Sequence, residues 1–320
     1  MSGRFSPDAD VNCRRLDDSR CGTLKPQLAP NAVRIAVALL CCVCTHAAAI
    51  AESILFVGNS FTFGSNSPVM TYRKESVTDL NRDGIGGVPA LFRTFSDQMR
   101  LGWQVSLETA AGQNLEWHWN NKRQLLDRKW DAVVLQDYST LDPQKPGDPA
   151  KTVEYSGRLA NMFRRRSPNV NLSMTATWSR PNLTYPPGER WSGQPIQRMA
   201  GDIRRAYDLA RAAHPSIKRI NPVGEAFNCA IALGIADPNP YDGITPGKID
   251  LWADDHYHAS TAGYYLEALV IFAGVTGLDP RKLGKNERAA RDLSVAPDLA
   301  VRLQRIAEDM AHRGGCRMKS

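Results

Sequence analysis

Residues 53–62 read SILFVGNSFT, an apolar run that ends at Gly58 and is followed by small polar residues. The run is shorter than an ordinary helix and shows no polar alternation, so it predicts a strand that is buried on both faces. A glycine after such a strand allows the chain to turn sharply. We therefore expect Ser60 to stand where the chain leaves one edge of a sheet.

Short β-rich runs of this kind alternate with longer helical patterns along the rest of the chain. The predicted strands span residues 54–57, 103–109, 132–136, 170–176 and 217–222. The predicted helices span residues 88–100, 115–126, 153–165, 196–213, 224–233, 261–276 and 298–312. This alternation predicts an α/β fold, a three-layer α/β/α sandwich around a five-stranded parallel sheet. Ligands bind at the carboxyl ends of the strands in such sheets, so functional residues should follow strands.

The composition is that of an ordinary globular protein. The 320 residues are 42% apolar and 23% charged, which is enough to build a sizeable core. The formal net charge is +7, but the basic residues are scattered among acidic ones and form no long block. We therefore do not expect a nucleic acid as partner.

The N-terminal part of the chain resembles an export signal. Residues 35–44 form an apolar run, and residues 47–49 are three alanines, a small-residue cleavage pattern. We predict a signal peptide over residues 33–49 and a mature domain over residues 52–320, exported to the periplasm or the extracellular space. Residues 1–32 fit no leader, so we interpret them as a non-native or mis-started extension and hypothesise that translation begins near Val33. The apolar run is too short for a stable membrane anchor.

Cysteine usage agrees with export. Five of the seven cysteines precede the predicted cleavage site, which leaves Cys229 and Cys316 in the mature chain. These two could form a disulfide or remain unpaired and buried, and the sequence leaves both options open. Within the predicted mature chain, residues 52–320, no Cys-x-x-Cys pair or Cys/His zinc spacing occurs.

A second polar cluster precedes the helix predicted at residues 261–276. Residues 254–260 read DDHYHAS, with Asp255 and His258 three residues apart. This spacing can bring the carboxylate beside the imidazole, as in a Ser-His-Asp triad. Two aspartates and two histidines could equally bind a metal ion, or simply cap the helix and fill a loop. Ser60 alone could also be no more than a helix cap, so the residues leave these interpretations open.

A resemblance favours one of them. The stretch GNSFT at residues 58–62 resembles the first block of the SGNH (GDSL-type) hydrolases, and DHYH at residues 255–258 resembles their last block. The similarity extends over roughly residues 53–280 and implies a flavodoxin-like fold. It implies an enzyme, a serine ester hydrolase that needs no metal or other cofactor. Ser60 would be the nucleophile, and Asp255 and His258 would complete the triad.

The middle blocks are less similar to the family. AGQNL at residues 111–115 resembles the block whose glycine donates to the oxyanion, which points to Gly112. The third block usually reads Gly-x-Asn-Asp, whereas residues 134–139 here read VLQDYS. Gln136 keeps a carboxamide, so we expect the oxyanion hole to consist of the Ser60 and Gly112 N–H groups and the Gln136 amide. A glutamine in this block resembles a poorly characterised bacterial branch of the family.

The substrate is less well defined by the sequence. We expect Asn59, His118 and Trp178 to contact it, although tryptophans beside strands are commonly buried. Aromatic residues at 117–119 and after the fourth strand suggest stacking on sugar rings, hence a small-molecule or acetylated carbohydrate ester. Two alternatives remain: a non-catalytic carbohydrate-binding protein on the same scaffold, and a metal-dependent phosphoesterase that uses Asp254 to His258.

Overall fold

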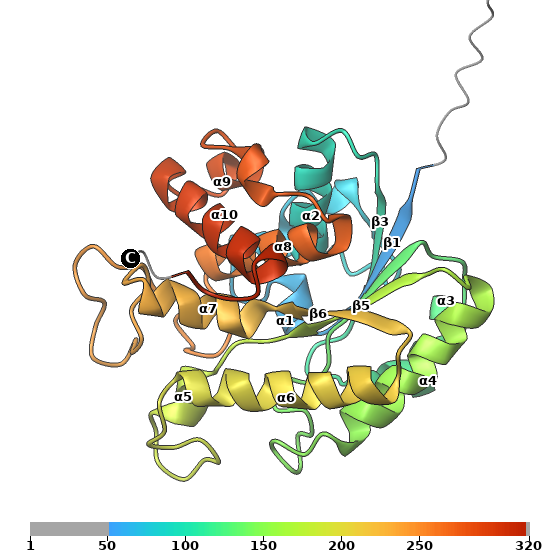
Figure 1. Ribbon diagram of the computed structural model, residues 1–320, viewed down its shortest axis with the longest axis horizontal. Helices are drawn as coiled ribbons and strands as arrows, with labels where there is room; N and C mark the ends of the chain where they lie inside the picture. Colours follow the sequence, from blue (N-terminus) through green and yellow to red (C-terminus); the bar gives the residue numbers. More distant parts are fainter. Residues whose placement is uncertain (1–50, 318–320) are drawn as a thin grey trace, which may run out of the picture. The chain divides into compact units, whose positions relative to one another are not determined.

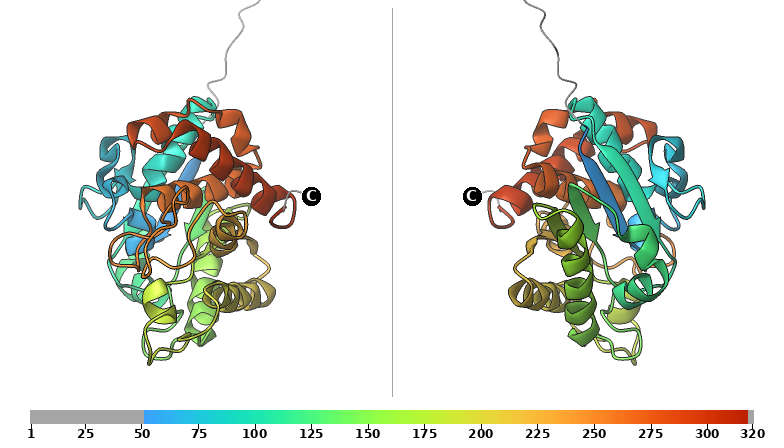
Figure 2. Two further views of the ribbon diagram at one scale, coloured as in Figure 1. Left: turned by 90° about the vertical axis from the view of Figure 1, so that its left-hand side faces the viewer. Right: turned by 90° about the vertical axis from the view of Figure 1, so that its right-hand side faces the viewer.

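The computed structural model describes residues 51–317, which form one parallel sheet between two layers of helices (Figures 1 and 2). The strand order is β2-β3-β1-β4-β5-β6. The strands are β1 (Ser53–Gly58), β2 (Thr78–Asp79), β3 (Gln104–Thr109), β4 (Ala132–Leu135), β5 (Asn171–Ala176) and β6 (Ile217–Pro222). The predicted extension at residues 1–32 and the predicted signal peptide at residues 33–49 lie outside the described residues.

The seven predicted helices are all present within a few residues of their expected ends. The helices are α1 (Ser60–Phe63), α2 (Gly87–Gln98), α3 (Leu115–Leu126), α4 (Ala150–Arg166), α5 (Pro181–Thr184), α6 (Gln197–Ala213), α7 (Val223–Ala232), α8 (Thr261–Thr276), α9 (Arg288–Asp292) and α10 (Pro297–His312), with short 3₁₀ turns at Pro68–Thr71, Lys74–Ser76 and Pro280–Leu283. None of the helices within residues 51–317 is long and apolar enough to cross a membrane.

The two layers explain why β1 is apolar from Ile54 to Val57. Helices α2, α7, α8 and α10 cover one face of the sheet, and α3, α4 and α6 cover the other (Figure 1). Ile54 and Phe56 pack into the first core, whereas Leu55 and Val57 pack into the second. Successive side chains of a strand point to opposite faces, so both faces of this central strand meet an apolar core.

The predicted number of strands was wrong by one. The sheet has a sixth strand, β2, which consists of Thr78 and Asp79 and pairs in parallel with β3 at the sheet edge. It lies in a stretch that shows no strand pattern, because two residues are too few to display any periodicity. β2 is held in place by tertiary contacts, such as the hydrogen bond from Leu80 N to Leu107 O at 2.9 Å.

The sheet brings the predicted site residues to one edge. Gly58 at the end of β1 lies beside Thr109 at the end of β3, and Val57 lies beside Leu135 at the end of β4. Ser60, Gly112 and Gln136 follow these three adjacent strands directly. The predicted site residues therefore stand at the carboxyl ends of three adjacent strands, and their function stays a prediction.

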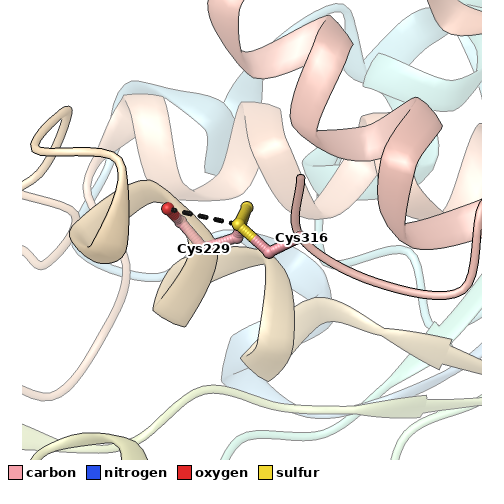
Figure 3. The surroundings of a disulfide bond; sticks show 2 residues. All are labelled: Cys229 and Cys316. Carbon is pink, nitrogen blue, oxygen red and sulfur yellow. Dashed lines mark hydrogen bonds between the residues drawn. A yellow bond between two sulfur atoms is a disulfide. The ribbon is translucent and has the colours of Figure 1, made fainter. Parts of the chain in front are cut away.

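Cys229 and Cys316 form a disulfide that joins α7 to the segment after α10 (Figure 3). The sequence left open whether these cysteines pair, and in the structure they do. The two cysteines are 87 residues apart, so the bond closes a long loop that includes α8, α9 and α10. Closing a loop of this length restricts the unfolded chain strongly.

We expect the variant in which both Cys229 and Cys316 are replaced by alanine to lose about 2–4 kcal/mol of unfolding free energy. Urea denaturation followed by circular dichroism measures this loss. Dithiothreitol should destabilise the wild-type chain by a similar amount and leave the double variant unaffected. A wild-type chain whose thiols are reduced without any change in the urea midpoint would contradict a stabilising role for the bond.

Candidate active site

Ser60 is the first residue of the short helix α1. Three hydrogen bonds of the Asn59 side chain fix the turn before it. The Asn59 side-chain oxygen accepts a hydrogen bond from Phe61 N at 3.2 Å. Its Nδ2 donates to Gln113 O at 2.9 Å and to Asp137 O at 3.3 Å. Asn59 therefore ties the turn after β1 to the segments after β3 and β4.

Gln136, which follows β4, also stabilises this turn. Its Oε1 accepts hydrogen bonds from Asn59 N at 3.0 Å and from Thr62 Oγ1 at 2.9 Å, and its Nε2 donates to Asp137 O. A Cβ atom at Gly58 would collide with Gln136 Oε1 and Thr62 Oγ1, which explains the glycine at the end of β1. Gln136 is 1% exposed, and its contacts hold the Ser60 turn in place.

Asp255 and His258 form the pair that their spacing predicted. Asp255 Oδ2 lies 2.6 Å from His258 Nδ1, and Asp255 Oδ1 accepts from the backbone N–H groups of Tyr257 and His258 at 3.0 and 2.9 Å. Asn66 Nδ2 donates to Asp255 Oδ2 at 2.6 Å. Burial raises the pKa of Asp255, but the hydrogen bonds from His258 and Tyr257 outweigh it and hold the pKa below its ordinary value. The carboxylate is thus ionised, and these hydrogen bonds fix its orientation.

His258 leaves its second ring nitrogen available. The side chain is nearly buried, and within residues 51–317 its Nε2 has no hydrogen-bond partner. The imidazole lies at the Ser60 turn, because its ring centroid is 5.7 Å from that of Phe61, the residue after Ser60. No hydrogen bond joins Nε2 to Ser60. Such contacts commonly tighten only when substrate binds.

The floor of the site is a stack of aromatic rings. Trp178 stacks on Phe61 with centroids 4.2 Å apart and on Phe227 at 5.0 Å. Its Nε1 donates to Tyr257 O at 3.1 Å, which links the floor to the His258 loop. The hydroxyl of Tyr264 on α8 donates to Ser60 O at 3.3 Å and to Ser65 O at 3.1 Å. Packing of this kind fixes the Ser60 turn relative to the His258 loop.

Gly112 stands exposed beside this turn. Its φ of +68° lies in the left-handed region that glycine adopts without strain, and no atom of residues 51–317 lies where its Cβ would be. Within residues 51–317, no hydrogen bond uses the backbone N–H of Gly112 or of Ser60. Both donors are therefore free for a ligand.

Asp137 braces the loop after β4. Its carboxylate accepts hydrogen bonds from Leu115 N at 2.9 Å, Tyr138 N at 2.8 Å and Thr152 Oγ1 at 2.5 Å. Burial raises the pKa of this carboxyl, and the hydrogen bonds only partly offset the effect. All of these partners are structural, so Asp137 belongs to the scaffold of the site.

The structure corrects the expected substrate contacts. Trp178 and His118 are fully buried, so neither presents a surface to a substrate. His118 Nδ1 lies 2.5 Å from Glu108 Oε2 inside the protein. Asn59 is 3% exposed, and both ends of its amide are occupied by backbone groups. Gln136 likewise turns its amide toward the backbone of Asp137, so its contacts favour a positioning role over direct oxyanion donation.

A cavity of about 490 Å³ opens on the β3 side of the Ser60 turn. Phe63 at the end of α1 and Ala111, next to Gly112, form part of its wall. Lys122 Nζ donates to Asn81 Oδ1 at 2.8 Å, and its ammonium lies 5.7 Å from the ring centroid of Trp117. The cavity therefore combines an apolar wall with fixed polar groups, next to the segment that carries Gly112.

No protein-family model matches the chain, and neither does any curated protein. Solved structures do match. A DUF4886 family protein from Bacteroides uniformis has a TM-score of 0.58 at 20% identity, and the match covers 83% of this chain and 97% of that one. A protein described as a GDSL-like lipase from Parabacteroides merdae has a TM-score of 0.51 at 16% identity, covering 71% and 95%.

The fold is that of the SGNH (GDSL-type) hydrolases. At these identities the likeness establishes the fold, and the chemistry has to be argued from the site. Within the SGNH fold, Ser60 follows β1 and the Asp255–His258 pair precedes α8. The catalytic role of these residues stays a prediction.

Sequence reasoning missed two residues of the site. Asn66 is exposed and adopts a φ of +58°, and it reaches Asp255 from a loop 189 positions earlier in the chain. Arg180 stacks on Tyr257, with its guanidinium carbon 3.6 Å from the ring centroid. A lone asparagine or arginine in a loop carries no local signal. Only the folded structure brings each of them to the His258 loop.

Proposed function

We propose that the chain is a serine ester hydrolase. Ser60 attacks the ester carbonyl while His258 Nε2 takes its proton, and an acyl-enzyme forms as His258 gives that proton to the oxygen of the leaving alcohol. His258 then activates a water that hydrolyses the acyl-enzyme. Asp255 holds the imidazole in the tautomer with hydrogen on Nδ1, which keeps Nε2 free as the base.

The observation that carries this proposal is the His258 side chain. Its Nδ1 is held by an ionised carboxylate at 2.6 Å, while its Nε2 is buried at the Ser60 turn and has no partner among the described residues. A buried nitrogen without a hydrogen bond is costly unless a ligand or a reacting group uses it. A base with this orientation suits proton abstraction from a neighbouring hydroxyl.

We assign the oxyanion to the free N–H groups of Ser60 and Gly112. Two donors on separate segments can converge on one oxygen because the turns after β1 and β3 lie side by side. Gln136 and Asn59 keep that geometry by tying the turn to its neighbours. Charge that develops on the carbonyl oxygen therefore meets donors that need not move.

The proposed substrate is an esterified carbohydrate or another small ester. We propose that the exported enzyme hydrolyses it outside the cytoplasm. The cavity beside Gly112 supports this class, since Trp117 and Phe63 offer apolar surface and Lys122 offers N–H donors. Small ligands bind well in cavities of this mixed kind. Export rests on the predicted signal peptide at residues 33–49.

A fluorophosphonate probe tests the proposal against both alternatives. A serine esterase should be labelled covalently at Ser60, which peptide mass spectrometry locates. A protein that only binds carbohydrate should not react. A metal-dependent phosphoesterase should instead show phosphatase activity that a chelator abolishes. Within residues 51–317 no cluster of three or more histidine, cysteine or acidic side chains is arranged to hold a metal, so no observation favours that alternative.

Gln136→Ala should lower kcat about 10²- to 10³-fold with little change in KM, the loss typical of a disturbed oxyanion site. Gln136→Glu separates the two possible roles, because a carboxylate can still accept from Asn59 N and Thr62 Oγ1 but cannot donate. Turnover of one activated aryl ester by both variants is the measurement. Recovery of activity in the glutamate variant supports positioning. A near-normal kcat for Gln136→Ala would remove this residue from the site.

A further inference from the structure

Arg180 is a buried cation at the edge of the site. It follows β5 by four residues and is only 8% exposed. Its Nε donates to Asn182 Oδ1 at 3.2 Å and its Nη1 donates to Ser139 Oγ at 3.1 Å. The face of its guanidinium lies on the ring of Tyr257, at 3.6 Å from the centroid.

These partners leave its charge uncompensated. Both hydrogen-bond acceptors are neutral, and none of the ion pairs formed within residues 51–317 includes Arg180. Burial lowers the pKa of Arg180, against opposing contributions from Tyr257, Tyr138 and Glu189, yet a guanidinium remains charged at any ordinary pH. A buried charge without an opposite partner costs free energy, and an anion bound beside it would recover part of that cost.

The position of Arg180 indicates which part of a substrate it would meet. The Tyr257 ring that it covers also contacts His258, with ring centroids 4.1 Å apart. His258 has to return its proton to the oxygen of the leaving alcohol, so the alcohol must lie on the His258 side of Ser60. The guanidinium lies on that same side, at the carboxyl ends of β4 and β5.

We propose that Arg180 binds a carboxylate on the alcohol part of the substrate. The preferred substrates are then acyl esters of acidic alcohols, such as a hydroxy acid or an acidic sugar. This inference rests on the proposed esterase function and narrows its substrate class. A guanidinium has five N–H donors, and the two hydrogen bonds to Asn182 and Ser139 leave the others for a carboxylate.

The competing explanation is structural. Stacking on Tyr257 could serve only to hold the His258 loop, in which case Arg180 would affect every ester alike. A pair of substrates with the same acyl group separates the two roles. 4-Acetoxybenzoate and 4-acetoxybenzamide have leaving groups of similar size, and only the first bears a negative charge.

The experiment compares kcat/KM for these two esters in the wild-type chain and in Arg180→Gln. The preference for the anionic ester should fall at least about 10-fold in the variant, the scale of one charge-assisted hydrogen bond. Arg180→Lys keeps the charge and should retain part of the preference. Arg158→Gln is the matched control, since Arg158 also stacks on a tyrosine, at 4.9 Å, but on the exposed side of α4. It should leave the preference unchanged.

A binding measurement keeps the test independent of turnover and of the folding of any variant. Titration calorimetry on the wild-type chain should show 4-hydroxybenzoate binding at least about 10-fold more tightly than 4-hydroxybenzamide. Anion binding that depends on Arg180 without hydrolysis of either ester would support the subsite and overturn the esterase proposal. Hydrolysis without any preference for the anion, or equal losses for both esters in Arg180→Gln, would overturn the subsite.

Discussion

Ser60→Ala should abolish hydrolysis of a short-chain aryl ester, with kcat at least about 10⁴-fold below that of the wild-type chain. Alanine keeps the backbone of the turn, and the hydrogen bonds that hold this turn come from Asn59 and Gln136 rather than from the Ser60 side chain. The variant should therefore remain folded, with an unchanged circular dichroism spectrum and melting temperature. Loss of activity in a folded protein isolates the chemical role of the hydroxyl.

Ser65→Ala is a suitable control for this experiment. Ser65 lies just after the same helix, and its backbone contacts Ser60 O and Tyr264, but its side chain takes part in no hydrogen bond within residues 51–317. The control should retain near-normal turnover. Activity of Ser60→Ala within about tenfold of wild type would rule out a nucleophilic role, because triad nucleophiles are worth several orders of magnitude.

The layers of the fold could be predicted from the sequence because long elements repeat their pattern. The apolar run of β1 and the amphipathic spacing of α4 or α6 each extend over enough residues to reveal their period. The strand β2 and the helices α1, α5 and α9 have two to five residues each and were not predicted. Elements this short are set by their contacts, such as the ring stack under Phe61.

In the candidate site, too, features set by local spacing could be predicted, and features set by distant contacts could not. Asp255 and His258 are three residues apart, so local geometry alone can pair them, and the structure does so at 2.6 Å. Trp178 was expected at a binding surface, yet it is buried, because sequence gives no sign of the two rings that enclose it. Gln136 was expected near Ser60 and is there, but the direction of its amide depends on partners from β1 and α1.

Asp255→Asn should lower kcat about 10⁴-fold while preserving the fold, as the same change does in the Ser-His-Asp template. The asparagine oxygen can still accept from the backbone N–H groups that now bind Asp255 Oδ1 at 2.9 and 3.0 Å. Its NH₂ group then faces His258 Nδ1 and Asn66 Nδ2, where two donors now point at the carboxylate. The imidazole can accept from this NH₂ only by moving its own hydrogen to Nε2, and Nε2 is then no longer a base.

Asp254→Asn provides the matched control for this change. Asp254 is the exposed neighbour of Asp255 and takes part in no hydrogen bond or ion pair within residues 51–317. Its replacement should leave kcat within a few-fold of wild type, so both variants remove one negative charge from the same loop with opposite results. Since the pKa of Asp255 lies below its ordinary value, the carboxylate is ionised from mildly acidic to alkaline pH, and the large loss should appear throughout that range. A severe loss in Asp254→Asn with a mild one in Asp255→Asn would show that Asp254, and not Asp255, is the triad carboxylate.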